Sequence, residues 1–200
     1  MQKLRQPLLA FALFALCSSP GFSQKPTTID FTAASNHFKQ LRESYAKAQP
    51  GAISWVSNDE RTKLLKLYDE AEPSKFLSAV EPWLLKCPVD ARAYVMAASL
   101  SAKIGKFEDS IRYRNHYYEL LASIVNSGDG RSAATAFKVI AIDEEYTLLN
   151  YMGADRKKQS LQGVCDVMDV EIEGKPMTIY FDVSIHLKGL QREFEPTNTK

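Results

Sequence analysis

A change in hydrophobic spacing at the segment SGDG, residues 127–130, constrains the fold more than any other feature of the sequence. Before this segment, apolar residues recur every three or four positions, which is the spacing of one face of an α-helix. After it, they recur at every second position, like the side chains on one face of a β-strand. The chain is therefore predicted to be an α+β protein in which helices precede a small antiparallel sheet.

Residues 24–126 are predicted to form a helical region. Ser57 and Glu60 have the spacing of a capping box, so a helix is expected to begin there. Pro82 lies inside a later apolar pattern, where it is expected to kink or restart a helix, because proline lacks the amide donor that the helix interior needs.

Two helices joined by a turn at Gly105 are predicted to form an antiparallel hairpin. The first has a small-residue face that lets the backbones approach closely, and the second has a larger apolar stripe. The short matches KFLSAV at 75–80 and KFEDSI at 106–111 are spaced close to the period of tetratricopeptide-type repeats. We therefore expect two degenerate tetratricopeptide-like hairpins. The small face consists of Ala93, Ala97 and Ala98, and the stripe of Phe107, Ile111, Tyr118 and Leu121.

Residues 127–195 are predicted to form an antiparallel β-sheet region with a C-terminal helix, followed by a polar tail at 196–200. Four strands joined by short turns indicate an antiparallel meander. Asp143 and Glu144 are expected in a tight turn and residues 153–159 in a polar loop. Ser184 is expected to cap the last helix. The predicted strands are 136–142, 145–151, 160–172 and 177–183.

The N-terminus has the pattern of a secretory signal. Lys3 and Arg5 precede an almost wholly apolar run, and small residues follow it. We expect residues 1–23 to be a signal peptide and the product to be exported, either to the periplasm or outside the cell. Anchoring as a lipoprotein through Cys17 is the alternative, but Leu16 stands where such a signal normally has a small residue.

Composition excludes some partners and leaves the state of the cysteines open. The formal net charge is +1, so a nucleic-acid-binding surface is not expected. After the signal, no segment is long and apolar enough to predict a transmembrane helix. Cys87 and Cys165 would remain in an oxidising compartment, where they could pair as a disulfide. Two buried free thiols are the alternative, because cysteine is often a small core residue.

The sequence contains no HExxH, CxxC, GxSxG or P-loop motif, and no cofactor or metal site is predicted. Asp182, Ser184 and His186 are the most catalytic-looking group, but we interpret them as the junction between a strand and a helix. No catalytic residue is therefore assigned.

The aromatic group in RNHYY, at residues 114–118, is a second candidate site. Tyr113, His116 and Tyr117 are candidate partner-binding residues, because stacked rings are common in recognition surfaces. Tyrosines at the boundary between a helix and water are the structural alternative.

Several short motifs resemble the bacterial family called domain of unknown function 4919. They are SGDGRSAATAFKVIAIDEEYTLLNYMG, SLQGVCD and IYFDVS, and the likeness covers roughly residues 60–184. The resemblance implies a secreted or envelope protein and supplies no catalytic residues. We therefore expect a non-catalytic binding or scaffolding module of the bacterial envelope, with a protein or peptide partner. The alternative is a ligand-binding or hydrolase-like enzyme with a pocket between sheet and helices.

Overall fold

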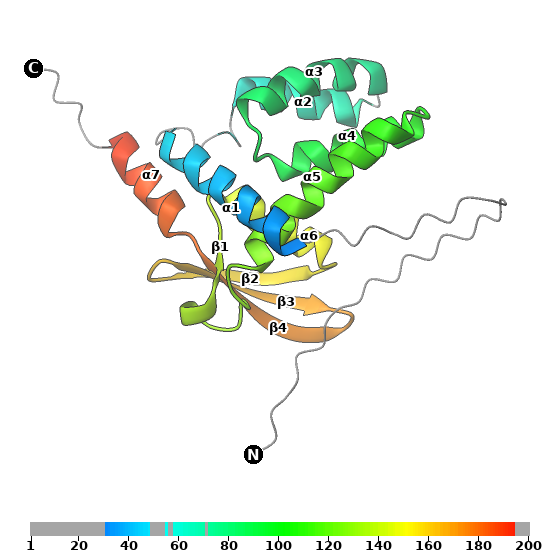
Figure 1. Ribbon diagram of the computed structural model, residues 1–200. Helices are drawn as coiled ribbons and strands as arrows, with labels where there is room; N and C mark the ends of the chain where they lie inside the picture. The colour runs from blue at the N-terminus through cyan, green and yellow to red at the C-terminus, as the bar shows by residue number, and fades with distance from the viewer. Residues whose placement is uncertain (1–30, 49–54, 56–57, 71, 195–200) are drawn as a thin grey trace, which may run out of the picture.

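The computed structural model describes residues 31–48, 55, 58–70 and 72–194 (Figure 1). The predicted signal peptide, the lipoprotein alternative at Cys17 and the polar tail lie outside these residues. The helices are α1 (Phe31–Ala48), α2 (Asp59–Asp69), α3 (Pro73–Lys86), α4 (Ala91–Lys103), α5 (Phe107–Val125), α6 (Ile142–Tyr151) and α7 (Ser184–Phe194). A 3-10 turn, η2 (Ala133–Thr135), precedes the strands β1 (Phe137–Lys138), β2 (Asp155–Gln162), β3 (Cys165–Ile172) and β4 (Lys175–Asp182).

The first five helices include two antiparallel hairpins, α2–α3 and α4–α5, with α3 packed on α4. The side chain of Asn58 caps α2, one position after the predicted Ser57, which lies outside the described residues. Its Oδ1 accepts hydrogen bonds from the amides of Glu60 and Arg61 at 2.8 and 3.4 Å. The expected restart at Pro82 is wrong, because α3 runs unbroken from Pro73 to Lys86.

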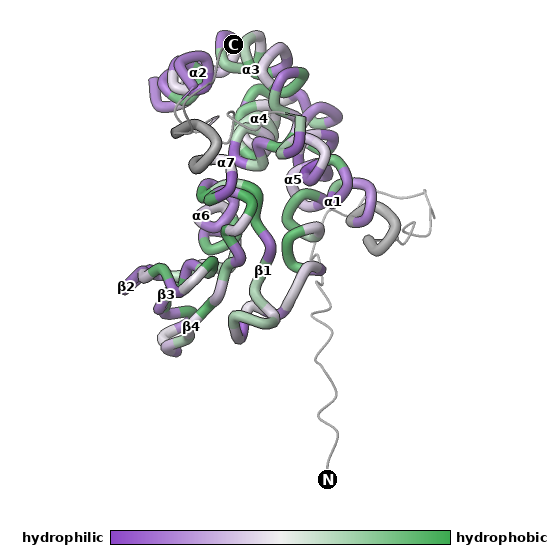
Figure 2. Tube along the Cα trace, turned by 90° about the vertical axis from the view of Figure 1, so that its left-hand side faces the viewer, coloured by the Kyte–Doolittle hydropathy of each residue, from purple (hydrophilic) through white to green (hydrophobic). Residues whose placement is uncertain are grey.

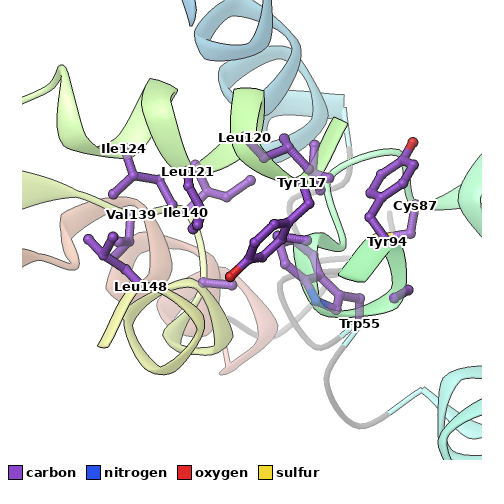
Figure 3. Close-up of a cluster of buried hydrophobic side chains, with 14 of the residues drawn as sticks. Trp55, Cys87, Tyr94, Tyr117, Leu120, Leu121, Ile124, Val139, Ile140 and Leu148 are labelled. Atoms are coloured by element: carbon purple, nitrogen blue, oxygen red, sulfur yellow. The ribbon is translucent and has the colours of Figure 1, made fainter. Parts of the chain in front are cut away.

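The α4–α5 hairpin supplies much of the hydrophobic core. The predicted small-residue face of α4 is buried against α5 as expected. The predicted stripe of α5 is wrong for three of its four residues, because Phe107, Ile111 and Tyr118 are exposed, whereas Leu121 is buried. Another face of α5 is buried, and Figure 3 shows part of it packed with Leu148 of α6 and with Val139 and Ile140. The buried face consists of Ser110, Tyr113, Tyr117, Leu120, Leu121, Ser123 and Ile124.

The four strands form one mixed sheet in the order β1-β4-β3-β2. Four strands were predicted, and β2, β3 and β4 do form an antiparallel meander, although most of β2 lies in the expected loop. The purely antiparallel sheet is wrong, because β1 pairs parallel to β4, with Phe137 opposite Phe181. Their rings lie 5.9 Å apart, centroid to centroid. Met168, Val170 and Ile179 line the same buried face as Phe181.

Two predicted strand assignments are corrected by the structure. Residues 145–151 belong to α6, so the expected tight turn at Asp143 and Glu144 is the first turn of this helix. The expected polar loop at 153–159 contains most of β2, an almost wholly exposed edge strand. The predicted strand 160–172 is therefore the end of β2, a turn at residues 163–164, and β3.

The SGDG segment turns the chain from α5 toward the sheet through unusually close backbone contacts. The amides of Asp129 and Gly130 both donate to the carbonyl of Thr135 at 2.9 Å, and the Gly130 carbonyl accepts from the Tyr180 amide in β4 at 2.9 Å. A Cβ atom on Gly128 would lie 2.5 Å from the Ala136 carbonyl oxygen and closer still to that of Thr135. Only glycine fits at 128 without displacing this backbone.

The sheet lies at one end of the molecule, with α6 beside it on the side of α4 and α5 and α7 rising from its other side (Figure 1). Figure 2 shows apolar stretches gathered where α6 meets its neighbours, while the peripheral α2 is mostly polar. Tyr146 of α6 contacts β2 twice. Its hydroxyl donates to Gln159 Oε1 at 3.0 Å, and the Arg156 guanidinium lies 4.5 Å from its ring centroid. This position makes the first turn of α6 the meeting point of helices and sheet.

Candidate functional site

Three consecutive acidic residues, Asp143, Glu144 and Glu145, form the first turn of α6 and are named here the acidic turn. Successive side chains on an α-helix point about 100° apart, so each carboxyl group reaches a different neighbour. Carboxylates also favour this end of a helix, where free amide groups carry partial positive charge. Glu144 and Glu145 are buried, and the side chain of Asp143 is 12% exposed.

Asp143 reaches toward α2 and contacts Arg61. Arg61 Nη2 donates to Asp143 Oδ2 at 2.8 Å, and its Nε and Nη2 also donate to the two oxygens of Asp90 at 2.6 and 3.1 Å. Asp90 in turn accepts the Trp83 indole N–H at 2.9 Å and caps α4 through the Ala93 amide at 3.1 Å. Burial raises the pKa of Asp143, and the Arg61 charge opposes that effect. This cluster connects α2, α3, α4 and α6.

Glu144 reaches toward α1 and forms a two-pronged ion pair with Arg42. Arg42 Nε and Nη2 donate to Glu144 Oε1 and Oε2 at 2.7 and 2.6 Å. The remaining donors of Arg42 reach Ser123 Oγ in α5 at 3.2 Å and the Lys138 carbonyl in β1 at 2.8 Å. Glu144 Oε2 also accepts the Ile140 amide at 2.9 Å. This second cluster connects α1, α5, β1 and α6.

Both arginine clusters have the chemistry of structural ion pairs. Arg42 is 3% exposed and Arg61 is 1% exposed, so a substrate could not reach either guanidinium without displacing the core. Arg42 donates to protein acceptors through Nε, Nη1 and Nη2, and Arg61 does so through Nε and Nη2, as a buried charge requires. No group of three or more metal-binding side chains occurs among the residues that the structure describes. The acidic turn therefore joins elements of the fold.

The structure places Asp182, Ser184 and His186 at the junction of β4 and α7, as interpreted from the sequence. The capping side chain is different from the predicted one. Asp182 Oδ1 accepts the Ser184 amide at 2.9 Å, so Asp182 caps the helix and Ser184 is its first residue.

The candidate partner-binding residues of α5 lie mostly inside the helical region. Tyr113 and Tyr117 are 3% and 7% exposed, and the Tyr113 hydroxyl donates to Glu81 Oε1 at 3.0 Å. His116 is half-buried and stacks on Tyr94, with ring centroids 5.2 Å apart. The rings of Tyr113 and Tyr117 thus pack in the core and leave little surface for a partner.

Both cysteines are buried and free in the structure, which is the second of the two alternatives that the sequence left open. Cys87 lies between α3 and α4, and burial raises its pKa to about 12. Cys165 begins β3, with its Sγ atom 4.0 Å from the Ala133 carbonyl oxygen. The two thiols therefore lie in the helical region and in the sheet, respectively.

A row of exposed apolar side chains on α5 is the surface feature that the sequence assigned to the core. Phe107, Ile111 and Tyr118 are spaced by four and seven residues, so they share one face of the helix. They are 66%, 48% and 41% exposed, and we name them the α5 row.

Next to the start of α5, a groove of about 270 Å³ lies against α3 and is lined partly by Leu77 and Ile104.

Sequence reasoning missed Arg42, Arg61 and Asp90. No local pattern marks either arginine as buried, because arginine is mostly exposed in folded proteins. The acidic run before YTLLN is typical of the first turn of a helix. This signal would have identified Asp143 and Glu144 as residues of one helix turn. No sequence signal paired the arginines with particular carboxylates.

Comparison with known proteins identifies the family of most of the chain. The family model described as "Domain of unknown function (DUF4919)" matches residues 32–192, which include all the strands and most of the helices. Comparisons with curated proteins and with solved structures gave no match. In the part of the chain that the structure describes, no helix is long and apolar enough to cross a membrane.

Proposed function

The chain belongs to the DUF4919 family, and we propose that it is an exported, non-catalytic binding or scaffolding module of the bacterial envelope. Export rests on the signal-like pattern of residues 1–23. We infer that the hairpins α2–α3 and α4–α5 act as degenerate tetratricopeptide-type units, which typically bind peptides or proteins on their surfaces.

The α5 row is the observation that carries this proposal. Large apolar side chains scattered singly on a surface are ordinary, but Phe107, Ile111 and Tyr118 follow one helix face. Tyr118 also packs against the half-exposed Tyr151 at the end of α6, with ring centroids 6.0 Å apart. An aromatic and aliphatic row of this kind supports contact with the apolar side chains of a protein or peptide partner.

The ionisable groups of the acidic turn support a role without catalysis. An enzyme needs titratable side chains that converge on a space which substrate can enter. Arg42, Arg61 and Glu144 are instead at most 3% exposed and are bonded to one another or to neighbouring elements. For the enzyme alternative, the pocket between sheet and helices would have to open by moving α6, because the acidic turn fills that position.

A capture experiment with a matched control tests the proposal. The chain from residue 24 is immobilised in three forms: wild type, the double variant Phe107→Ser with Ile111→Ser, and Leu85→Ser. Leu85 lies on α3 and is 86% exposed, so its replacement removes apolar surface away from the α5 row. All three should fold equally, because each substitution is at an exposed position.

We expect a protein from envelope extract to bind the wild type and the Leu85→Ser control but not the double variant. The same ranking should then appear with the purified partner in calorimetry, with at least a tenfold weaker Kd for the double variant. Equal retention by all three forms would show that the α5 row is not the binding surface. Turnover of an envelope substrate by the wild type would refute the non-catalytic role.

A further inference from the structure

Glu145, the third residue of the acidic turn, differs from its two neighbours in having no cation. It is 0% exposed, and among the residues that the structure describes neither carboxyl oxygen has a hydrogen-bond donor. An ionised carboxylate in such a place would be strongly destabilising, because burial removes its hydration and nothing replaces it. The charge state of Glu145 therefore needs a different explanation from those of Asp143 and Glu144.

A second carboxyl group, that of Asp166 in β3, lies on the side of the sheet that α6 contacts. Gln159 bonds both Asp166 and Tyr146, which follows Glu145 in α6. Asp166 is 7% exposed. Its Oδ2 atom accepts the side-chain amide of Gln159 in β2 at 2.8 Å, which leaves Oδ1 for a second donor. Two buried carboxyl groups can lie side by side when one of them keeps its proton and donates a hydrogen bond to the other.

The charged groups on the surrounding elements do not neutralise Glu145. Glu144, on the same helix, adds negative charge to the site. Arg42 of α1 is bonded to Glu144, and Arg61 of α2 to Asp90 and Asp143. On α4, Arg92 acts on Asp143. Lys138 of β1 contributes its carbonyl oxygen to Arg42 and has an exposed side chain.

We propose that Glu145 and Asp166 share one proton and form a pH-sensitive link between α6 and the sheet. The protonated Glu145 carboxyl donates to the Asp166 carboxylate, which Gln159 holds in place. When this proton is lost, two buried carboxylates face each other without a cation. Their repulsion favours separation of α6 from β3, and α6 is also the helix that carries the partners of Arg42 and Arg61.

The direction of the pKa agrees with this geometry. Burial, then the charges of Asp166 and Glu144, raise the pKa of Glu145 from 4.5 to about 9. Since the folded state holds the proton more tightly than the unfolded chain, the link stabilises the fold fully below about pH 4.5 and is lost as pH rises to about 9. In that window each pH unit should raise the unfolding equilibrium constant by about tenfold.

Chemical unfolding of the whole mature chain at pH 5, 6, 7 and 8 tests this link through the variant Glu145→Gln. Glutamine has a similar shape and an amide that can donate to Asp166, but it does not titrate. Relative to this variant, the wild type should lose about tenfold in folding equilibrium constant per pH unit. The matched control is Glu173→Gln, an exposed residue in the β3–β4 turn, which should keep the wild-type slope.

Infrared difference spectroscopy provides a test that does not depend on folding of the variant. At pH 7 the folded wild type should show the carbonyl band of a protonated carboxylic acid, and this band should disappear as pH approaches 9 to 10. Absence of the band at pH 7 would overturn the proposal. A Glu145→Gln variant with the same pH slope as wild type would overturn it as well.

Discussion

Replacement of Arg61 by methionine is the sharpest test of the ion pairs around the acidic turn. The guanidinium is 1% exposed and donates to three carboxylate oxygens, two on Asp90 and one on Asp143. Methionine fills much of the same volume but removes the cation that bonds both carboxylates, and Asp90 is 1% exposed. Breaking a buried pair in this way typically costs about 3–5 kcal/mol, whereas domains are stable by about 5–15 kcal/mol.

Urea unfolding at pH 7, followed by circular dichroism in the presence of a reductant, measures this loss. Lys86→Met is the matched control. Lys86 Nζ lies 2.8 Å from Glu60 Oε1, a distance like those of Arg61, but both side chains are more than half exposed. Its loss should be within about 1 kcal/mol. A loss below about 1 kcal/mol for Arg61→Met, or one equal to the control, would refute the structural role of the Arg61 cluster.

Three further predictions concern the close packing of the fold. Gly128→Ala should lower the unfolding free energy by about 1–3 kcal/mol in the same urea assay, because the new Cβ would collide with the backbone carbonyls of Thr135 and Ala136. An unchanged urea midpoint would contradict that contact. Phe181→Ala should cost about 3–5 kcal/mol by emptying a fully buried site, and a loss under 1 kcal/mol would place this ring outside the core. Burial raises the pKa of Cys87 to about 12, so its thiol stays protonated below that pH. Mass spectrometry should therefore find Cys87 alkylated at pH 8 only after the chain is unfolded. Rapid alkylation of Cys87 in the native chain would contradict this.

The elements that could be predicted from sequence are those whose pattern agrees with their surroundings. The hairpin around Gly105 was predicted because its helices carry breakers at the turn and small residues at the contact. The strand at 177–183 was predicted because one face of β4 is buried and the other is solvated over part of its length. In both, a local pattern and the tertiary packing favour the same structure.

The errors in the sheet region arise where packing overrides local preference. EYTLLNY has strand-forming residues, but it follows acidic residues and packs as α6 between the sheet and α4. DRKKQ shows no alternation because β2 is an edge strand, exposed on nearly all its positions. Its positive charges also discourage pairing with other chains, as is common at sheet edges.

The candidate site was the least predictable part of the molecule. The α5 row looked like a core stripe, because Phe107 and Ile111 have the same spacing as buried residues. Only the positions of α1 and α4 decide that the Tyr113 and Tyr117 face is buried instead. The partners of Arg42 and Arg61 lie on α6 and on the loop before α4, so their pairing depends on the tertiary fold.

Native-state hydrogen exchange measures most directly whether the acidic turn joins the helices and the sheet into one cooperative unit. Arg42 and Arg61 tie α1 and α2 to α6, and Gln159 of β2 bonds both Tyr146 of α6 and Asp166 of β3. The most protected amides of α4, α5, β3 and β4 should therefore share one opening free energy, equal to that from urea unfolding. An opening free energy for the strand amides several kcal/mol below that for the amides of α4 and α5 would contradict this single unit.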